Sequence, residues 1–319
     1  MRYIDIVNQL RSGGHGPGRD TVEPPHFLHI CPSLTMPVTC QFDTERRFGG
    51  LERLYGPGSL QTLRNAHVVV AGIGGVGSWC AEALARCGVG ALSLIDLDHV
   101  AESNINRQLH ALTETLGQSK VAAMAQRVHG INPECRVRLV DDFVSPDNVA
   151  DVLGDEAGLV IDCTDQAQAK IAMILHARAR KIPILVCGGA GGKTNPLALR
   201  AGDLALAVND ALLAKLRNTL RRHHHYPKAS DHAGKPRRRL PKMGIRALWF
   251  DQPVLLPAQW LATDVDLTDP GRLAGAQPPA DTLQGLSCAG YGSVVTVTAA
   301  MGMAASNEAV HWMLNGKFA

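Results

Sequence analysis

Residues 72–77 read G-I-G-G-V-G and lie between a β-branched run and a helical pattern. Gly72 permits a tight turn, and Gly77 lets the following helix pack closely on a sheet. Gly74 and Gly75 let a phosphate approach the backbone, where the helix N-terminus supplies free N–H groups and a partial positive charge. This context predicts a nucleotide site; the alternative is a glycine turn that holds no ligand.

Two acidic residues, Asp96 and Asp98, follow the next apolar run. The carboxylate of Asp96 can accept hydrogen bonds from ribose hydroxyl groups, and we place Asp98 in the same site. These features do not choose between ATP and NAD, because the same spacing fits a dinucleotide.

Two cations come next in the chain, in the segments S-N-I-N-R-Q (103–108) and G-Q-S-K (117–120). Attack on the α-phosphate of ATP builds negative charge and releases pyrophosphate, so fixed cations lower that barrier. A hydride-transfer site has little need of them. Arg107 and Lys120 are therefore candidate catalytic residues; the alternative is that both are surface charges.

Asp165 ends the segment D-C-T-D (162–165), at the carboxyl end of an expected strand. Open α/β sheets bind ligands at that edge. Mg²⁺ commonly uses one or two carboxylates together with phosphate oxygens, which makes Asp165 a candidate catalytic residue and metal ligand. Asp165 could also cap the helix that follows, and the two roles are compatible.

The elements that position these residues alternate between strand and helix patterns. Strands are expected at 67–71, 91–95, 136–140, 159–163 and 184–187, and helices at 78–87, 119–130, 167–180 and 203–220. The alternation predicts an α/β fold with a Rossmann-like, mostly parallel sheet and flanking helices. Residues 288–314 are strongly apolar and are expected to close the core as a C-terminal extension, in preference to spanning a membrane.

Composition divides the chain into three parts. Residues 1–43 are expected to be a flexible extension rich in Gly, Pro and His, and residues 44–202 an ATP-binding Rossmann-like domain. The C-terminal part, 203–319, holds a basic crossover loop (215–246) and an irregular insert (247–285).

The charge of the chain is concentrated in the basic loop. Residues 215–246 contain eleven Lys or Arg and one acid, so the segment carries +10; the whole chain carries +3, which leaves −7 for the remainder. This concentration of charge indicates a local anionic partner, with nucleic acid as the leading candidate. The alternative is a solvated loop that binds nothing. The histidines of this loop are expected to face RNA rather than a metal: His223, His224, His225 and His232.

The eight cysteines include no C-x-x-C pair, which argues against a four-cysteine zinc site. We expect a reducing, cytoplasmic setting, with no signal peptide and with membrane association left open. Cys187 and Cys288 are candidate nucleophiles, but a buried structural thiol is the expected state of each.

Five motifs in order resemble those of the ubiquitin-activating-enzyme-like superfamily, which includes the adenylating enzymes of molybdopterin and thiamine biosynthesis. They are G-I-G-G-V-G, L-I-D-L-D, S-N-I-N-R-Q, G-Q-S-K and D-C-T-D, and the likeness covers residues 46–201, extending more weakly to the C-terminus. The resemblance implies that Gly74 and Gly75 bind phosphate, that Asp96 binds ribose and that Asp165 binds magnesium.

The same resemblance assigns Asn104, Arg107 and Lys120 to the phosphates of ATP. Arg47 matches an N-terminal arginine that, in relatives, reaches across a homodimer to the partner's ATP, and Arg53 is an alternative.

A closer likeness is to the tRNA threonylcarbamoyladenosine dehydratase branch. The segments that carry it are R-F-G-G (47–50), R-L-Y-G (53–56), G-G-V-G-S-W (74–79), R-Q-L-H-A-L (107–112), N-P-E-C-R-V (132–137), D-D-F (141–143), G-G-A-G-G (188–192) and C-A-G-Y-G (288–292). This branch implies ATP-dependent cyclisation of the threonylcarbamoyl group beside a tRNA anticodon. AMP is transferred to the carboxylate, and a ureido oxygen then closes the ring and expels AMP.

The resemblance also implies partners and leaves rivals. The basic loop 215–246 would contact tRNA, a homodimer is expected, and sulfur-relay proteins are candidate partners. The first rival activity is adenylation of a ubiquitin-like sulfur carrier, although Ala247 stands where some relatives carry a cysteine. An NAD-dependent oxidoreductase and a nucleotide-sensing scaffold are the other two.

Overall fold

Seven strands form one sheet at the centre of the computed structural model, which describes residues 42–231, 235, 237–256 and 291–319. Their order across the sheet is β3 (Arg136–Val140), β2 (Ala91–Ile95), β1 (His67–Ala71), β4 (Leu159–Asp162), β5 (Ile184–Cys187), β7 (Arg246–Phe250) and β6 (Leu199–Asp203). All neighbours are parallel except β6, which runs antiparallel to β7. The predicted Rossmann-like, mostly parallel sheet is confirmed.

The central strands are continuous runs of apolar residues because helices cover both faces of the sheet. Every residue of β2, β4 and β5 is buried, and β1 is buried after its first residue. Parallel strands covered on both sides lack the polar alternation of a half-exposed strand. This explains why the apolar segments H-V-V-V-A and L-V-I-D form the central strands β1 and β4.

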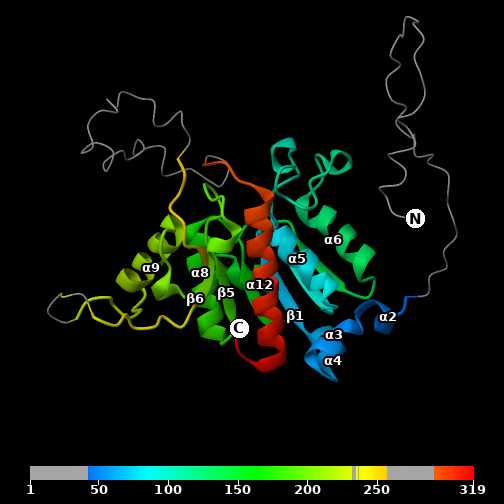
Figure 1. Ribbon diagram of the computed structural model, residues 1–319, viewed down its shortest axis with the longest axis horizontal. Coiled ribbons are helices and arrows are strands. Elements are labelled where there is room, and N and C mark those ends of the chain that lie inside the picture. The colour runs from blue at the N-terminus through cyan, green and yellow to red at the C-terminus, as the bar shows by residue number, and fades with distance from the viewer. Residues whose placement is uncertain (1–41, 232–234, 236, 257–290) are drawn as a thin grey trace, which may run out of the picture. The chain divides into compact units, whose positions relative to one another are not determined.

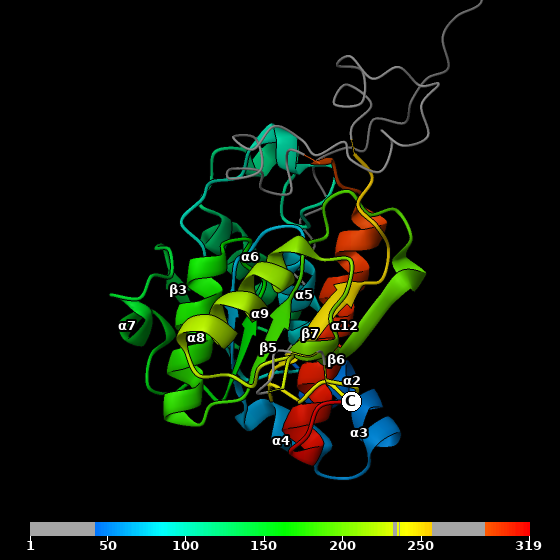
Figure 2. The ribbon, with the colours of Figure 1, turned by 90° about the vertical axis from the view of Figure 1, so that its left-hand side faces the viewer.

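Two layers of helices enclose the sheet (Figures 1 and 2). The core on one face includes residues from α5 (Gly77–Arg86), α6 (Lys120–Ile131) and α12 (Val295–Asn315). The core on the other face includes residues from α7 (Val149–Leu153), α8 (Ala167–Arg180) and α9 (Ala211–His223). Three short helices precede β1: α2 (Thr44–Phe48), α3 (Gly50–Tyr55) and α4 (Ser59–Asn65). Single-turn 3₁₀ helices occur at η1 (Glu102–Asn104), η2 (Thr113–Thr115), η3 (Pro196–Ala198) and η4 (Leu204–Leu206).

The last helix, α12, lies against α5, and a glycine permits the close approach. A Cβ atom on Gly302 would lie 2.5 Å from the carbonyl oxygen of Val76 and 2.8 Å from Cβ of Trp79. The expectation that this apolar stretch closes the core is confirmed for residues 295–315. Among the residues whose placement is described, no helix is long and apolar enough to cross a membrane.

The register of three strands brings the candidate residues to one edge. Ala71, the last residue of β1, pairs with Ile95 of β2 and with Asp162 of β4. The residues that follow these strands therefore emerge side by side. The strand order also reverses between β1 and β4, which is where open α/β sheets form a ligand crevice.

Several elements differ from the sequence prediction, which did not include strands β6 and β7 or helix α7. The helix expected over 203–220 begins only at Ala211, because Asp203 ends strand β6 and its carboxylate accepts hydrogen bonds from the N–H groups of Ala205, Met243 and Gly244. Asp210 caps α9 by accepting from Leu213 N at 2.9 Å.

Strand β7 was missed altogether, since its last four residues were placed in the irregular insert 247–285. A buried strand of five residues lacks the alternation of apolar and polar residues by which a strand is recognised in a sequence. In addition, residues 215–223 of the predicted basic loop belong to α9. Residues 1–41, most of the remaining insert and Cys288 lie outside the described residues.

Candidate functional site

The glycine turn connects β1 to α5, and two of its glycines are required by close backbone contacts. Gly72 has a φ of +85°, and a Cβ atom there would lie 2.9 Å from the carbonyl group of Cys163. A Cβ atom on Gly77 would lie 1.8 Å from the carbonyl oxygen of Gly72. Gly72 and Gly77 therefore shape the turn, as the sequence predicted.

The other two glycines differ from each other. A Cβ atom on Gly74 would meet only the side-chain nitrogen of Gln108, at 4.0 Å, so the space in front of Gly74 is open. At Gly75 the same atom would contact Thr298 at 3.2 Å and Arg107 at 3.3 Å. Gly74 is thus the position where a phosphate can come closest to the backbone, whereas Gly75 faces side chains.

The turn leaves backbone donors free. Across the part of the chain that is described, the N–H groups of residues 74–77 make no hydrogen bond, and Val76, the N-cap of α5, makes no side-chain cap. In contrast, Gly72 N donates to Ile95 O at 2.8 Å, and Ile73 N donates to Asp96 Oδ2 at 2.7 Å. Free N–H groups at a helix N-terminus bind anions.

Asp96, Asp98 and Lys120 form a charged group beside the turn. Lys120 is buried, and its amino group lies 2.6 Å from Asp98 Oδ2 and 3.8 Å from Asp96 Oδ1. Burial raises the pKa of Asp96 above its ordinary value, while Lys120 and the N–H groups of Asp98 and Ile73 oppose that shift. Asp96 is therefore anchored by its neighbours, and the structure brings the side chains of Asp96, Asp98 and Lys120 together.

Arg107 and Asn104 follow on the same side. Nη1 of Arg107 donates to Ser103 O at 2.8 Å and to Asn106 Oδ1 at 3.0 Å. Asn104 is buried, and its oxygen accepts from Ala101 N at 3.1 Å. The Arg107 side chain lies against Gly75, which brings a cation to the turn.

The structure also shows contacts that the sequence did not predict. Trp79 Nε1 donates to the carbonyl oxygen of Arg107 at 3.0 Å, and Thr298 Oγ1 donates to the same oxygen at 3.4 Å. Thr298 belongs to α12, so the C-terminal part completes the wall of the site. Only its place in a small-residue helix that must pack closely could have indicated this.

Several buried polar atoms near this group have no partner within the described ranges. They are Gln108 Oε1, both ring nitrogens of His110, Gln118 Oε1 and Ser119 Oγ. Burial, with lesser effects of Lys120 and Arg127, lowers the pKa of His110 to about 4. His110 is therefore neutral at neutral pH.

Asp162 and Asp165 lie at the end of β4 but differ in surroundings. Asp162 is fully buried, and its Oδ1 lies 3.1 Å from Nζ of Lys170, which also donates to Cys187 O at 2.8 Å. Burial raises the pKa of Asp162, with Lys170 and Thr164 opposing. This buried ion pair was not predicted from the sequence, because a single Lys within a helical pattern usually indicates a surface residue.

Asp165 is exposed, and its carboxylate makes no hydrogen bond or ion pair to any described residue. The alternative role as helix N-cap is not observed, since Gln166 is the N-cap of α8 and makes no side-chain bond. A free carboxylate at this sheet edge fits an ion held jointly with phosphate oxygens. Within the described part, no group of three His, Cys, Asp or Glu could hold a metal by itself.

Arg47 and Arg53 do not reach this site within one chain. Arg47 Nη1 donates to the carbonyl oxygen of Ile131 at 2.8 Å, and its guanidinium lies 4.9 Å from the ring centre of Phe42. Ile131 ends α6, whereas Lys120 begins it, and a helix of 12 residues is about 18 Å long. Arg53 is exposed on α3.

The cysteine near the site is a core residue. Cys187 is 1% exposed, and its sulfur lies 3.9 Å from that of Cys163. The pKa of Cys163 is raised by the hydrogen bond to Cys187 and by burial, and burial raises that of Cys80. A thiol buried in apolar surroundings, as that of Cys187 is, is a poor nucleophile.

The basic residues of 215–246, apart from the half-buried Arg221, fall into two groups. Arg217 Nη1 donates to Ala207 O at 2.7 Å, and Arg246 forms a double hydrogen bond with Glu308 at 2.7 and 3.0 Å, so these two hold the fold together. In contrast, the following members are exposed: Lys215, Arg222, Lys228, Lys235, Arg237, Arg238, Arg239 and Lys242. The positive surface is therefore smaller than the sequence count suggests.

Comparison with known proteins gives a consistent set of relatives. The ThiF family model matches residues 48–318. The tRNA threonylcarbamoyladenosine dehydratase of Escherichia coli is 41% identical over 270 residues, covering 84% of this chain and 94% of the relative. A crystal structure of that enzyme with ATP is similar with a TM-score of 0.69 and 38% identity, covering 85% of this chain and 95% of the other.

A second kind of relative matches over a shorter range. The molybdopterin-synthase adenylyltransferase of E. coli is 34% identical over 130 residues, which is 41% of this chain and 51% of that protein. The similarity to the dehydratase thus extends over both the nucleotide-site region and the C-terminal part.

Proposed function

This chain belongs to the ThiF family, and we propose that it is an ATP-dependent tRNA threonylcarbamoyladenosine dehydratase. The observation that carries the proposal is the likeness to the E. coli dehydratase over 94% of that enzyme's length. The open glycine turn, with free backbone donors next to Asp96, Lys120 and Arg107, supports ATP as the nucleotide. A crystal structure of the E. coli relative with ATP supports the same choice over NAD.

The reaction we propose has two steps. The carboxylate of the threonylcarbamoyl group attacks the α-phosphorus of ATP, which forms a carboxyl–AMP anhydride and releases pyrophosphate. The ureido oxygen then attacks the activated carbonyl carbon, and the C–O bond to AMP breaks. One carboxylate oxygen leaves in AMP, so the nucleoside loses the elements of water.

The residues of the turn would bind and orient the triphosphate. The N–H groups of residues 74–77 point to phosphate oxygens, and Asp96, held by Ile73 N at 2.7 Å, accepts from the ribose. Arg107 and Lys120 offset the negative charge that grows on the α-phosphate. We place Asn104 with them; Asp98 holds the amino group of Lys120 at 2.6 Å and is a positioning residue.

Asp165 would hold Mg²⁺, because its carboxylate is exposed and has no partner among the described residues. A bound Mg²⁺ neutralises phosphate charge and orients the leaving pyrophosphate. No covalent enzyme nucleophile is required, in agreement with the buried state of Cys187.

We further propose a homodimer in the cytoplasm, in which Arg47 of one copy serves the ATP site of the other. For this, Arg47 must leave the carbonyl oxygen of Ile131, with which it bonds in the single chain. Sulfur-relay proteins stay predicted partners. The exposed cations of 215–246 are proposed to contact the tRNA backbone.

The test is mass spectrometry of tRNA nucleosides after incubation of the full chain with ATP, Mg²⁺ and tRNA that carries threonylcarbamoyladenosine. We expect loss of one water per modified nucleoside and one AMP per turnover. If the carboxylate is labelled with ¹⁸O, one label must appear in AMP. An unchanged nucleoside, with an active dehydratase assayed in parallel, would refute the proposal.

The rival activity is tested in the same preparation. An adenylyltransferase for a sulfur carrier would transfer AMP to the C-terminus of a ubiquitin-like protein without tRNA, and would leave the nucleoside mass unchanged. The shorter match to the molybdopterin-synthase adenylyltransferase makes this the second candidate.

A further inference from the structure

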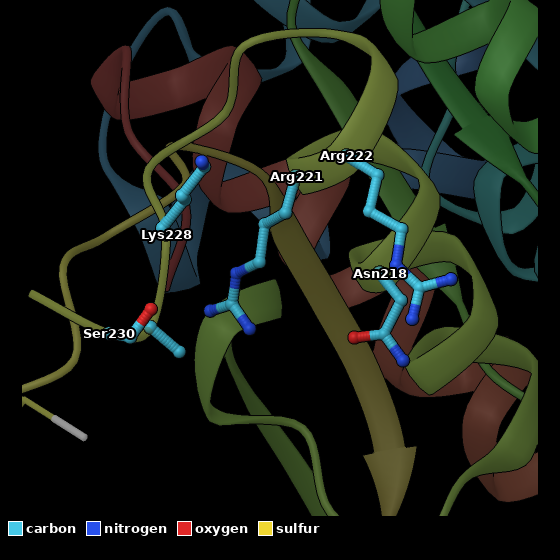
Figure 3. A pocket seen from close by; sticks show the side chains of 6 residues that line it. Asn218, Arg221, Arg222, Lys228 and Ser230 are labelled. Carbon is cyan, nitrogen blue, oxygen red and sulfur yellow. The ribbon is translucent and has the colours of Figure 1, made fainter. Parts of the chain in front are cut away.

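A basic pocket opens between the C-terminal end of α9 and the loop that follows it (Figure 3). It has a volume of about 480 Å³ and shares no residue with the glycine turn. Its lining contains three cationic side chains and no carboxylate: Asn218, Arg221, Arg222, Lys228, Ala229 and Ser230. In Figure 3, Arg221 lies between Lys228 and Ser230 on one side and Arg222 and Asn218 on the other.

Arg221 is the residue whose surroundings are incomplete. Its Nε donates to Pro227 O at 3.1 Å, but its Nη2 is buried and has no acceptor in the described structure. A buried charged donor without an acceptor is costly, so such groups normally have a ligand or an ion pair. Arg222 and Lys228 likewise form no ion pair with any described residue.

The positive charge is also concentrated. Burial lowers the pKa of Arg221, the neighbouring Arg217 lowers it further, and Asp203 opposes the shift. The oxygens of Asp203 are already occupied by the N–H groups of Ala205, Met243 and Gly244. An anion in the pocket would relieve this unfavourable arrangement.

The wall opposite α9 is held in place by contacts of its own. Tyr226 is buried, and the guanidinium of Arg178 lies 4.7 Å from its ring centre. Arg237 donates from its backbone to Ala229 O at 2.9 Å and from Nε to Ser230 O at 3.0 Å. The pocket therefore exists before a ligand arrives, which lowers the entropic cost of binding.

We propose that this pocket binds one backbone phosphate of the tRNA, with Arg221 and Lys228 as the cations and Ser230 and Asn218 as neutral donors. The exposed cations Arg237–Arg239 continue beyond the pocket, which suits a polyanion better than a free phosphate ion. That the RNA is a tRNA rests on the proposed function, whereas the binding of a backbone phosphate by this pocket does not.

The test compares three single variants of the full chain that lose the same charge. Arg221→Gln and Lys228→Gln remove pocket cations, whereas Lys215→Gln removes an exposed cation from the same helix, α9, outside the pocket. Affinity for tRNA is measured by fluorescence anisotropy over a range of salt concentrations.

Each pocket variant should weaken tRNA binding about tenfold. It should also make the negative slope of log K against log salt shallower by about 0.7 to 0.9. Lys215→Gln should change affinity less than about twofold. Equal losses of tRNA affinity in all three variants would show that the positive charge acts diffusely, and would overturn the proposal that the pocket binds a phosphate. Lys228→Gln guards against misfolding, because Lys228 makes no bond within the described residues whereas Arg221 supports the turn at Pro227.

Inorganic phosphate separates the two sources of the anion. At constant ionic strength, phosphate should not displace tRNA beyond the effect of chloride; displacement at low concentration would assign the pocket to free phosphate and overturn the proposal. The proposed function fails separately. If the wild-type chain yields no dehydrated nucleoside while the ranking of variants holds, the pocket stands without that activity.

Discussion

The carbonyl oxygen of Gly72 lies 1.8 Å from the point that a Cβ atom on Gly77 would occupy. No side chain can therefore be added at Gly77 without moving the start of α5. We predict that Gly77→Ala lowers the free energy of unfolding by at least about 2 kcal/mol, measured by urea denaturation. Gly130→Ala, in the last turn of α6 with no atom within 4 Å of the added Cβ, is the control. It should be neutral or stabilising by about 0.5 kcal/mol.

Gly74→Ala should separate folding from binding. The added methyl group would meet no atom closer than 4.0 Å, so the unfolding free energy should stay within about 0.5 kcal/mol of wild type. The methyl group would nevertheless occupy the open space in front of the turn. We expect ATP to bind at least about tenfold more weakly by calorimetry, because the phosphate loses its approach to the backbone. Unchanged affinity would place the phosphate elsewhere.

Lys120→Met should shift the pH dependence of ATP binding. Asp96 must be ionised to accept from ribose, so affinity falls as pH drops through its pKa, which burial already raises. Lys120 opposes that rise, and its loss should move the midpoint of the acidic decline to higher pH. Affinity at neutral pH should also fall about tenfold or more from the loss of a phosphate contact. A weaker affinity with an unmoved midpoint would show that Lys120 does not influence Asp96.

Lys170→Met should be strongly destabilising. It leaves the fully buried carboxylate of Asp162 without its cation, at a cost of about 3–5 kcal/mol in unfolding free energy. Since the folded-state pKa of Asp162 is raised, the penalty grows as pH rises above the unfolded-state value, and the variant should be relatively more stable in mild acid. The double variant Asp162→Asn/Lys170→Met should recover part of the loss; an additive result would exclude coupling.

The exposed arginines of the basic loop should bind RNA by charge. Replacing Arg237, Arg238 and Arg239 with Gln should weaken tRNA binding and flatten its salt dependence by about 2 in slope. Arg246→Met is the contrast, since Arg246 is paired with Glu308 and belongs to β7. That variant should lower stability and leave the salt slope unchanged. Unchanged tRNA affinity of the triple variant at low salt would remove the loop from the interface.

Local signals predicted the half of the fold that surrounds the nucleotide site. The strands His67–Ala71 and Ala91–Ile95 were placed at their true ends because apolar runs stop at glycine or acidic residues. The turn chemistry of Gly72 and Gly77 is likewise local. These features depend on neighbours within a few residues, which a sequence displays directly.

Features that depend on distant partners were not predicted. Arg246 appeared to be one more cation of a basic loop, because its partner Glu308 is 62 residues away. Lys170 resembled a surface residue until β4 placed Asp162 beside it. The pocket at Arg221 likewise needs a turn that buried Tyr226 holds. Such contacts follow from the packing of whole elements, and single-residue patterns do not contain them.

Because α12 packs against the glycine turn, this part of the site is completed late in synthesis. The turn leaves the ribosome early, whereas Thr298, which touches Gly75, and Gly302, which lies against Val76, are translated more than two hundred residues later. A nascent chain can form the first strands but has no wall behind the nucleotide crevice until α12 emerges. A fragment that ends before α12 lacks the contacts of Thr298 and Gly302 at the turn, and we expect it to bind ATP more weakly than the full chain.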